Sequence, residues 1–219
     1  MITLDQLLLV SGAAVVFALM PGPAVIYVVT RSVHQDRRAG IMSCLGIGAG
    51  NLALVFATAL GLSALLASSL IIYNVARFLG ALYLFYLGIR TFIDRSELVG
   101  TEPVQPQSLL RVFRQGLMVG VSNPKAALFF LAFLPQFVDR AHGAVTSQII
   151  LLGTVVVLIT LVSDTGYAVL ADGIAQGLLR RPRLIRAQQL LAGCVYVGLG
   201  LAAAFTGTHA LDGSTSARP

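Results

Sequence analysis

Long apolar runs alternate with short polar stretches along this chain, and most of the polar stretches contain arginine. A helix needs about 20 apolar residues to cross the hydrocarbon core of a bilayer. Each apolar run reaches about this length, so each predicts one transmembrane helix. The six predicted spans are Leu7–Thr30, Ile41–Leu66, Leu70–Phe92, Gly116–Val138, Gln148–Leu170 and Gln189–Thr206.

The boundary between the second and third runs is the least distinct. Only Ser68, Ser69 and Asn74 mark a turn there, and without this turn the count falls to five spans. The first run is too long for a cleavable signal peptide and lacks a basic leader, so we interpret it as a permanent span.

Composition supports a membrane protein over a soluble one. Of the 219 residues, 57% are hydrophobic and 11% are charged, and the mean hydropathy is +0.86. Soluble domains carry about 45–50% apolar and about 25% charged residues. The chain is therefore expected to form a single all-α, polytopic transmembrane domain. Its net charge of +6 lies in loops without interleaved aromatic residues, which argues against nucleic-acid binding.

The loop arginines predict the orientation of the spans, because basic loops stay in the cytoplasm. They gather in the first, third and fifth loops, whereas the other side offers only Arg140 and Arg218. Both termini should then be periplasmic. Loop three, residues 94–115, is the longest and is predicted to be a flexible cytoplasmic linker. The basic residues of the three cytoplasmic loops are Arg31, Arg37, Arg38, Arg90, Arg95, Arg111, Arg114, Arg180, Arg181, Arg183 and Arg186.

The order of short motifs indicates an internal repeat. Gly22-Pro23 in the first run corresponds to Asn123-Pro124 in the fourth, and Tyr83 in the third corresponds to Tyr196 in the sixth. The repeat halves are about 4–93 and 116–207, with the linker between them. Because three spans is an odd number, the two halves must have opposite orientations. Such a three-plus-three inverted repeat is typical of transporters.

Proline motifs interrupt the first and fourth runs in their middle. Pro21, Gly22 and Pro23 break the first run, and Asn123 and Pro124 break the fourth, because proline removes backbone donors. A packing kink explains one such motif. Two at matched positions favour a cavity lined by broken helices, where irregular backbone is tolerated at membrane depth.

Two charged residues lie clearly inside the predicted spans, away from their ends, and their signs are opposite. Lys125 is central in the fourth run and Asp164 lies in the fifth. A charge at this depth costs at least about 2.5–3.5 kcal/mol and usually faces the protein interior with a partner. One reading is a structural ion pair between them. The other is a polar site shared with substrate or with a coupled proton, and the two readings are compatible.

Other polar and small residues in the spans have both structural and functional readings. Asn51 is central in the second run, and Tyr167 shares a helix face with Asp164. Either side chain suits a substrate or a neighbouring helix backbone. The Gly46-x-x-x-Gly50 and Gly116-x-x-x-Gly120 patterns indicate close helix packing rather than a nucleotide loop. No Cys/His spacing predicts a metal site, and no catalytic constellation predicts an enzyme.

Several motifs together resemble the LysE/RhtB family of amino-acid exporters. They are Leu19-Met20-Pro21-Gly22-Pro23-Ala24, Arg38-Ala39-Gly40, the segment Gly80–Arg90, Asn123-Pro124-Lys125-Ala126 and Phe133-Leu134-Pro135-Gln136-Phe137. The resemblance extends from about Leu4 to Gly207. It implies efflux of amino acids or their derivatives across a bacterial inner membrane, energised by the proton gradient.

These observations predict a secondary exporter of a zwitterionic amino acid. Lys125 and the N-terminus of a broken half-helix suit the carboxylate, and Asp164 suits the ammonium group or carries the coupling proton. The expected partners are the amino acid, protons and membrane lipid, with no cofactor and no metal, and the small-residue faces permit a homodimer. The alternative is a channel or metal-ion exporter on the same scaffold.

Overall fold

The computed structural model describes residues 2–20, 22–68, 105–139 and 144–171, together with single helical positions in the third and sixth predicted spans. Most of those two spans lies outside the described residues, as do Pro21, the first half of the linker (94–104) and the arginines of loop five. The single positions are Val75, Phe78, Leu79, Leu82, Phe85, Tyr86, Ile89, Leu190, Cys194, Val197 and Gly198.

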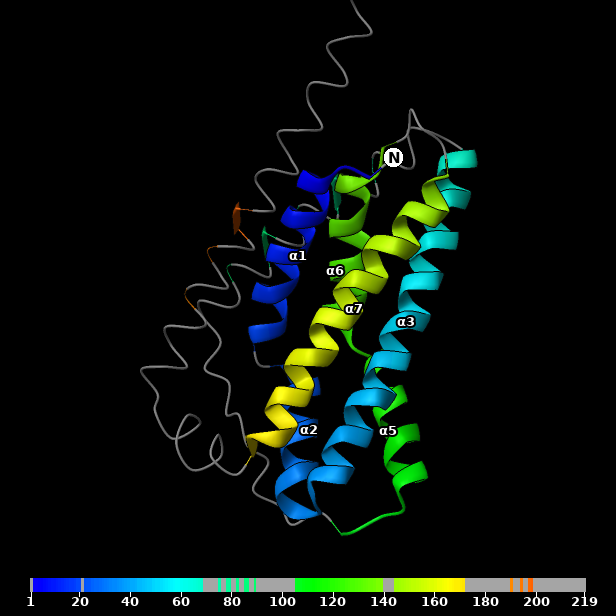
Figure 1. Ribbon diagram of the computed structural model, residues 1–219. Helices are drawn as coiled ribbons and strands as arrows, with labels where there is room; N and C mark the ends of the chain where they lie inside the picture. The colour runs from blue at the N-terminus through cyan, green and yellow to red at the C-terminus, as the bar shows by residue number, and fades with distance from the viewer. Residues whose placement is uncertain are drawn as a thin grey trace, which may run out of the picture.

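All regular structure in the described part is helical (Figure 1). By length and composition α3 and α7 can each span a membrane, whereas α1 with α2 and α5 with α6 form candidate spans that bend by 54° and 47°. These elements confirm the predicted all-α, polytopic membrane fold. The elements are α1 (Leu4–Leu19), α2 (Pro23–His34), α3 (Arg37–Ser68), α5 (Leu109–Val121), α6 (Pro124–Phe133), the 3₁₀ helix η1 (Leu134–Phe137) and α7 (Val145–Val169).

The fourth span differs from the prediction at its start. Helix α5 begins at Leu109, about two turns before the predicted Gly116. Arg111 and Arg114 lower the local hydropathy, but they lie on the exposed face of an amphipathic helix whose other face buries Val112 and Gly116. The C-terminal part of the predicted linker is therefore helix and not loop.

The two bent pairs run in opposite directions through the bundle. The α1/α2 pair leads away from the end marked N in Figure 1, and the α5/α6 pair leads back toward it. Helix α3 packs along α5 and α6, while α7 packs along α1 and α2, and α3 and α7 also contact each other. Exchanging the first bent pair and α3 for the second bent pair and α7 reproduces these contacts, but among the described residues α3 also packs on α2, whereas α7 makes no comparable contact with α6.

Glycines allow α3 and α5 to approach closely. A Cβ on Gly120 would lie 2.5 Å from the carbonyl oxygen of Ile47, and one on Gly46 would lie 2.3 Å from that of Phe113. No larger side chain fits at such distances. The contact confirms that the two Gly-x-x-x-Gly patterns are packing motifs.

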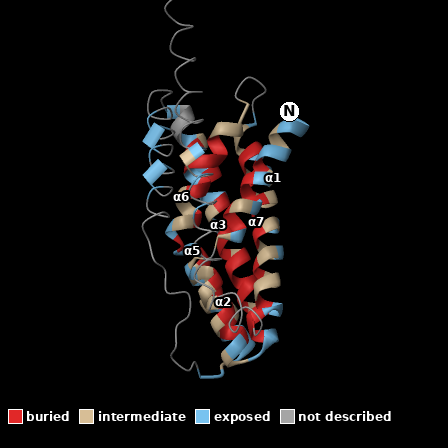
Figure 2. Cartoon of the chain, turned by 90° about the vertical axis from the view of Figure 1, so that its left-hand side faces the viewer, coloured by how far each residue is buried: buried red, intermediate tan, exposed pale blue. Residues whose placement is uncertain are grey.

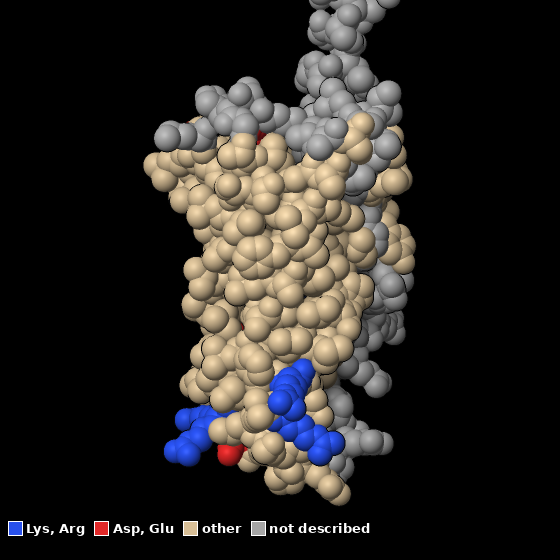
Figure 3. All heavy atoms as spheres, turned by 90° about the vertical axis from the view of Figure 1, so that its right-hand side faces the viewer, with Lys and Arg blue, Asp and Glu red and all other residues tan. Residues whose placement is uncertain are grey.

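The buried core is apolar and rich in aromatic rings. Phe17, Phe129, Phe133 and Phe137 form a continuous stack, with successive ring centroids 4.3, 4.7 and 4.7 Å apart. Buried residues line the inside of the bundle and exposed ones its outside (Figure 2). The exposed residues include many large apolar side chains, which a bilayer accommodates. Figure 3 shows a broad belt without charged side chains, and the described basic residues visible on this face gather at one end.

Candidate functional site

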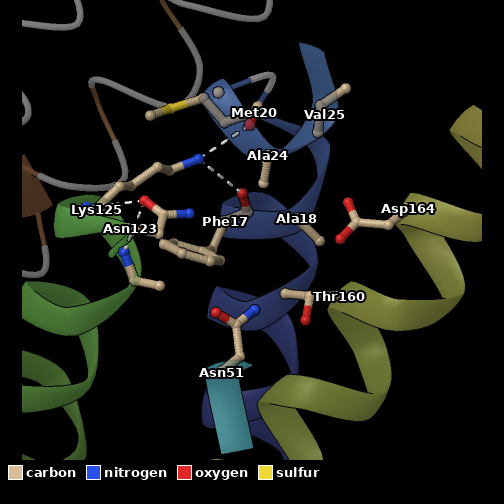
Figure 4. Close-up of a pocket in the computed structure, with 12 residues that line it drawn as sticks. Phe17, Ala18, Met20, Ala24, Val25, Asn51, Asn123, Lys125, Thr160 and Asp164 are labelled. Atoms are coloured by element: carbon tan, nitrogen blue, oxygen red, sulfur yellow. Dashed lines mark hydrogen bonds between the residues drawn. The ribbon is translucent and has the colours of Figure 1, made fainter. Parts of the chain in front are cut away.

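A small cavity of about 30 Å³ lies where the two broken spans and helices α3 and α7 meet. Irregular backbone at both breaks brings side chains and backbone groups from four spans to one place (Figure 4). The lining residues are Phe17, Ala18, Met20, Gly22, Ala24, Val25, Asn51, Asn123, Lys125, Ala126, Thr160 and Asp164.

The second break, between α5 and α6, is closed by its own local sequence. The Asn123 side chain accepts hydrogen bonds from the backbone N–H groups of Lys125 and Ala126, at 3.1 and 3.4 Å. Pro124 follows at the first helical position, where a missing N–H costs nothing. The N-terminus of α6 is thus a capped helix end.

The first break, between α1 and α2, is closed on its carbonyl side by residues distant in sequence. Lys125 Nζ donates to the carbonyl oxygens of Phe17 and Met20, at 3.2 and 2.9 Å. Ser163 Oγ donates to Ala18 O at 3.3 Å, and the Tyr167 hydroxyl donates to Leu19 O at 3.0 Å. A helix end leaves its last four carbonyls without intrahelical partners. Here side chains of α6 and α7 supply donors to the four carbonyls of residues 17–20.

The other side of the first break, the N-terminus of α2, has no side-chain cap. Gly22 is the N-cap residue and Pro23 the first helical residue, so neither supplies an acceptor for the first-turn N–H groups. Ala24 and Val25 follow in that first turn and line the cavity. An uncapped helix N-terminus carries a partial positive charge and binds carboxylates or other anions.

The acceptors of the cavity lie on α3 and α7. Asp164 is 7% exposed and Asn51 is 5% exposed. The Asn51 Oδ1 atom is buried without a hydrogen-bond partner. Within the described part of the chain, Asp164 makes no hydrogen bond or ion pair, and Thr160 lies one turn before it on α7. Two buried acceptors thus remain available to a ligand that donates protons.

Lys125 and Asp164 do not form an ion pair. Figure 4 places them on opposite sides of the first break, with Lys125 directed to the carbonyls of α1 and Asp164 on the other side of that helix. The Lys125 ammonium also lies 4.5 Å from the centroid of the Phe17 ring, a favourable cation–π distance. The direct structural pair considered from the sequence is therefore not the arrangement in this structure.

The structure brings together most of the residues singled out from the sequence. Five of them line the cavity: Gly22, Asn51, Asn123, Lys125 and Asp164. Pro23 and Pro124 begin α2 and α6 without lining it, and Tyr167 holds the end of α1. Pro21 is outside the described residues.

Sequence reasoning missed several groups at the site. Phe17, Thr160 and Ser163 carried no separate signal, although Thr160 and Ser163 lie within one turn of Asp164. The spacing of four residues from a buried acid is the signal by which Thr160 could have been found. The backbone carbonyls of α1 were not predictable as ligands of Lys125, because that contact joins distant parts of the chain.

Comparison with known proteins identifies relatives over most of the chain. A protein-family model described as "LysE type translocator" matches residues 15–207. An uncharacterized membrane protein of Vibrio cholerae serotype O1 is 28% identical over 190 residues, which are 86% of this chain and 91% of that protein. A homoserine/homoserine lactone efflux protein of Salmonella typhimurium is 28% identical over 183 residues, 84% of this chain and 88% of that protein.

A leucine efflux protein of Salmonella typhimurium is 32% identical over 129 residues, 58% of this chain and 60% of that protein. No solved structure matches the chain.

Proposed function

The chain belongs to the LysE-type translocator family, and on that premise we propose that it exports amino acids or their derivatives as a secondary transporter. Relatives named for homoserine and leucine efflux support this class of cargo. An exporter of amino acids is also favoured over an exporter of metal ions. Among the described residues there is no group of three or more His, Cys, Asp or Glu arranged to hold a metal.

The observation that carries the proposal is the division of the cavity into donors and acceptors. The uncapped N-terminus of α2 offers N–H groups beside the Lys125 side chain, and Gly22 lies next to that side chain. Asp164 and Asn51 offer acceptors. A zwitterionic amino acid has a carboxylate for the first set and an ammonium group for the second.

The size of the cavity assigns this conformation to a closed state of the cycle. A volume of about 30 Å³ holds one to three water molecules, whereas ligand pockets usually measure about 300–1,000 Å³. Export therefore requires the helices around the breaks to separate. We propose that the halves 4–93 and 116–207 form the inverted repeat that rocks about this site, which the opposite directions of the two bent pairs support.

We assign the basic end of the bundle to the cytoplasm of a bacterial inner membrane. Loop one and the start of α5 lie at this end, and both carry exposed arginines. Basic loops stay on the cytoplasmic side, so the N-terminus of α1 would be periplasmic.

Asp164 is the proposed proton carrier. It is the acid at the cavity, and in a secondary transporter a buried carboxyl group can exchange a proton as the site changes its access. Substrate ammonium and proton would then compete for one group. This competition couples the inward flow of protons to the outward flow of cargo.

Transport in proteoliposomes tests the function. Purified protein would be assayed with radiolabelled leucine and homoserine, with and without an imposed pH gradient. We expect stimulation by the gradient in the wild type and in Asp5→Asn, a matched acid-to-amide change at an exposed position far from the cavity. Asp164→Asn should lose the stimulation and keep substrate exchange. Transport of neither these nor other amino acids by the wild type would contradict the export proposal.

A further inference from the structure

A second pocket, separate from the cavity at the breaks, lies between α2 and α5 at the basic end. It has a volume of about 540 Å³ and is open to the surroundings of the bundle. Three arginines from the two helices contribute to its wall, beside apolar and uncharged side chains. The lining residues are Tyr27, Arg31, Arg111, Arg114, Gln115, Met118 and Val119.

Arg31 is the unusual member of this wall, because it is only 5% exposed. Its guanidinium donates to Gln115 Oε1 at 2.8 Å and to the Gln105 carbonyl oxygen at 3.4 Å, and it lies 5.6 Å from the centroid of the Tyr27 ring. All three partners are uncharged, and no acid of the described chain forms an ion pair with it. Burying a cation without a counter-charge is costly, so the site calls for an anion.

The geometry of the group selects the kind of anion. A guanidinium has five N–H donors in a planar fork, and two of those of Arg31 are occupied by the bonds to Gln115 and Gln105. The remaining donors, with the exposed Arg111 and Arg114, provide several donors around one pocket for a tetrahedral oxyanion. Such clusters bind phosphate groups through paired hydrogen bonds.

The position of the pocket indicates where the phosphate comes from. The basic end borders the uncharged belt of Figure 3, at the level expected for lipid headgroups. Met118 is largely exposed on the same wall, and Leu110, one turn before Arg114, is exposed on the same helix. A cationic cluster above apolar surface matches an anionic phospholipid, whose phosphate and acyl chains need these two surfaces.

We propose that Arg31, Arg111 and Arg114 form a binding site for a phosphate group, supplied by an anionic phospholipid of the cytoplasmic leaflet. The lipid would brace α2 against α5 from outside. This site is distinct from the cavity that holds the cargo, so its occupancy can be measured on purified protein without any transport assay.

Native mass spectrometry of the full chain in neutral detergent provides the test. Phosphatidylglycerol and phosphatidylcholine with identical acyl chains are the lipid probes, and inorganic phosphate is the soluble competitor. The pocket variant is Arg111→Gln/Arg114→Gln, whose residues are exposed and whose folding should be unaffected. The matched control is Arg37→Gln/Arg38→Gln, which removes the same charge from exposed positions at the same end, outside the pocket.

We expect the wild type and the control to retain phosphatidylglycerol in preference to phosphatidylcholine. The pocket variant should bind phosphatidylglycerol at least about tenfold more weakly, as expected when charge-assisted bonds are lost. Arg31→Gln should weaken the binding of phosphatidylglycerol more than the pocket variant does. Displacement by millimolar inorganic phosphate would identify free phosphate as the source of the group, and resistance would identify the lipid.

Displacement by inorganic phosphate would thus overturn the assignment to a lipid, and two further results would overturn the site itself. Equal weakening in the pocket variant and in the control would show diffuse electrostatic attraction by the whole basic end. Equal retention of phosphatidylglycerol and phosphatidylcholine by the wild type would show that no site selects the anion.

Discussion

The two breaks lie in the first and fourth predicted spans, and each is followed by a helix that begins with proline, yet they are stabilised differently. At the second break Asn123 caps α6, and the backbone N–H groups of Ser122 and Asn123 return to carbonyls at the end of α5. At the first break the N-cap is Gly22 and the carbonyls of α1 bind side chains of α6 and α7. One break is closed locally and the other by tertiary contacts.

Under the export function proposed above, this difference predicts different roles for the two breaks. A break closed by its own residues keeps its shape whatever its neighbours do, so the second break is suited to be a fixed support. The first break depends on contacts that can be exchanged, and its open N–H groups are available to a ligand. We therefore infer that α2 and its attachment to α1 move during transport, whereas the junction of α5 and α6 stays intact.

The largest expected effect is on stability, and it concerns the close packing on α3 of α5, the helix that leads into the second break. In Gly120→Ala, the new Cβ would meet Ile47 O at 2.5 Å, so α5 could not stay packed on α3. We expect a loss of stability of at least about 2 kcal/mol. In Gly12→Ala on α1, where nothing lies within 4 Å, stability should be unchanged or slightly higher. Thermal unfolding in detergent measures the stability of both variants. Equal destabilisation by Gly120→Ala and Gly12→Ala would contradict the inference that close packing on α3 fixes the position of α5.

The second prediction concerns Lys125, whose side chain links the second break to the carbonyls at the first break. Lys125→Met leaves the carbonyls of Phe17 and Met20 without their donor, at a cost of about 1–3 kcal/mol for each group that stays unpaired. Export should be lost, because the first break no longer has a defined shape. Lys125→Arg, which keeps a donor cation, should restore part of the stability.

The double variant Lys125→Met/Asp164→Asn separates this role from charge balance. If the two residues served only to neutralise each other, the double variant would regain transport. We expect it to insert in the membrane and remain inactive in the proteoliposome assay. A fully active double variant would reduce both residues to structural roles.

A smaller effect is expected from the cap itself. Asn123→Ala removes the acceptor for two backbone N–H groups and should cost about 1 kcal/mol. Asn123→Asp keeps an acceptor and should cost less. Gly22→Ala has no cap to lose and its Cβ would be 3.6 Å from Lys125, an ordinary contact, so stability should change little. Equal melting shifts for Asn123→Ala and Gly22→Ala would contradict the difference between the breaks.

The substitutions Pro23→Ala and Pro124→Ala should have the smallest effects on stability, but the two should differ in their effects on export. Pro23→Ala restores an N–H that can reach Leu19 O, in competition with Tyr167, and so allows α1 to continue into α2. We expect about a tenfold loss of export, equivalent to about 1.4 kcal/mol. In Pro124→Ala the Asn123 cap still begins α6 as a helix separate from α5, so export should stay within about twofold. Similar losses in both variants would show that the breaks are equivalent.

The sequence allowed prediction of where helices break but not of how the breaks are held. Proline and its neighbours act locally, so the positions at Pro23 and Pro124 followed from backbone chemistry alone. The partners of the α1 carbonyls are more than a hundred residues away along the chain, and no local pattern identifies them. For the same reason Tyr167 could be placed on the face of Asp164 while its actual contact, Leu19 O, could not be foreseen.

The start of α5 illustrates a different limit. A run of high hydropathy predicts only the part of a helix that lies in the hydrocarbon core. An amphipathic turn at the membrane interface has a low mean hydropathy and is therefore not predicted. Arg111 and Arg114 made this turn resemble a linker, although its buried face packs on the bundle. Because residues 109–115 were predicted as part of the linker, the pocket between α2 and α5 could not be predicted from the sequence.

The stack of Phe17, Phe129, Phe133 and Phe137 has a consequence for the cell rather than for the cargo. It begins at Phe17, which lines the cavity, and continues along α6 to Phe137 in η1, and its rings offer no hydrogen-bonding lone pairs along which a chain of water could form. A membrane in which many copies of an idle carrier leaked would lose its respiratory charge. In the orientation and function proposed above, the aromatic column would insulate the periplasmic half of the resting protein, so that the presence of the exporter in the membrane would not by itself dissipate the proton gradient.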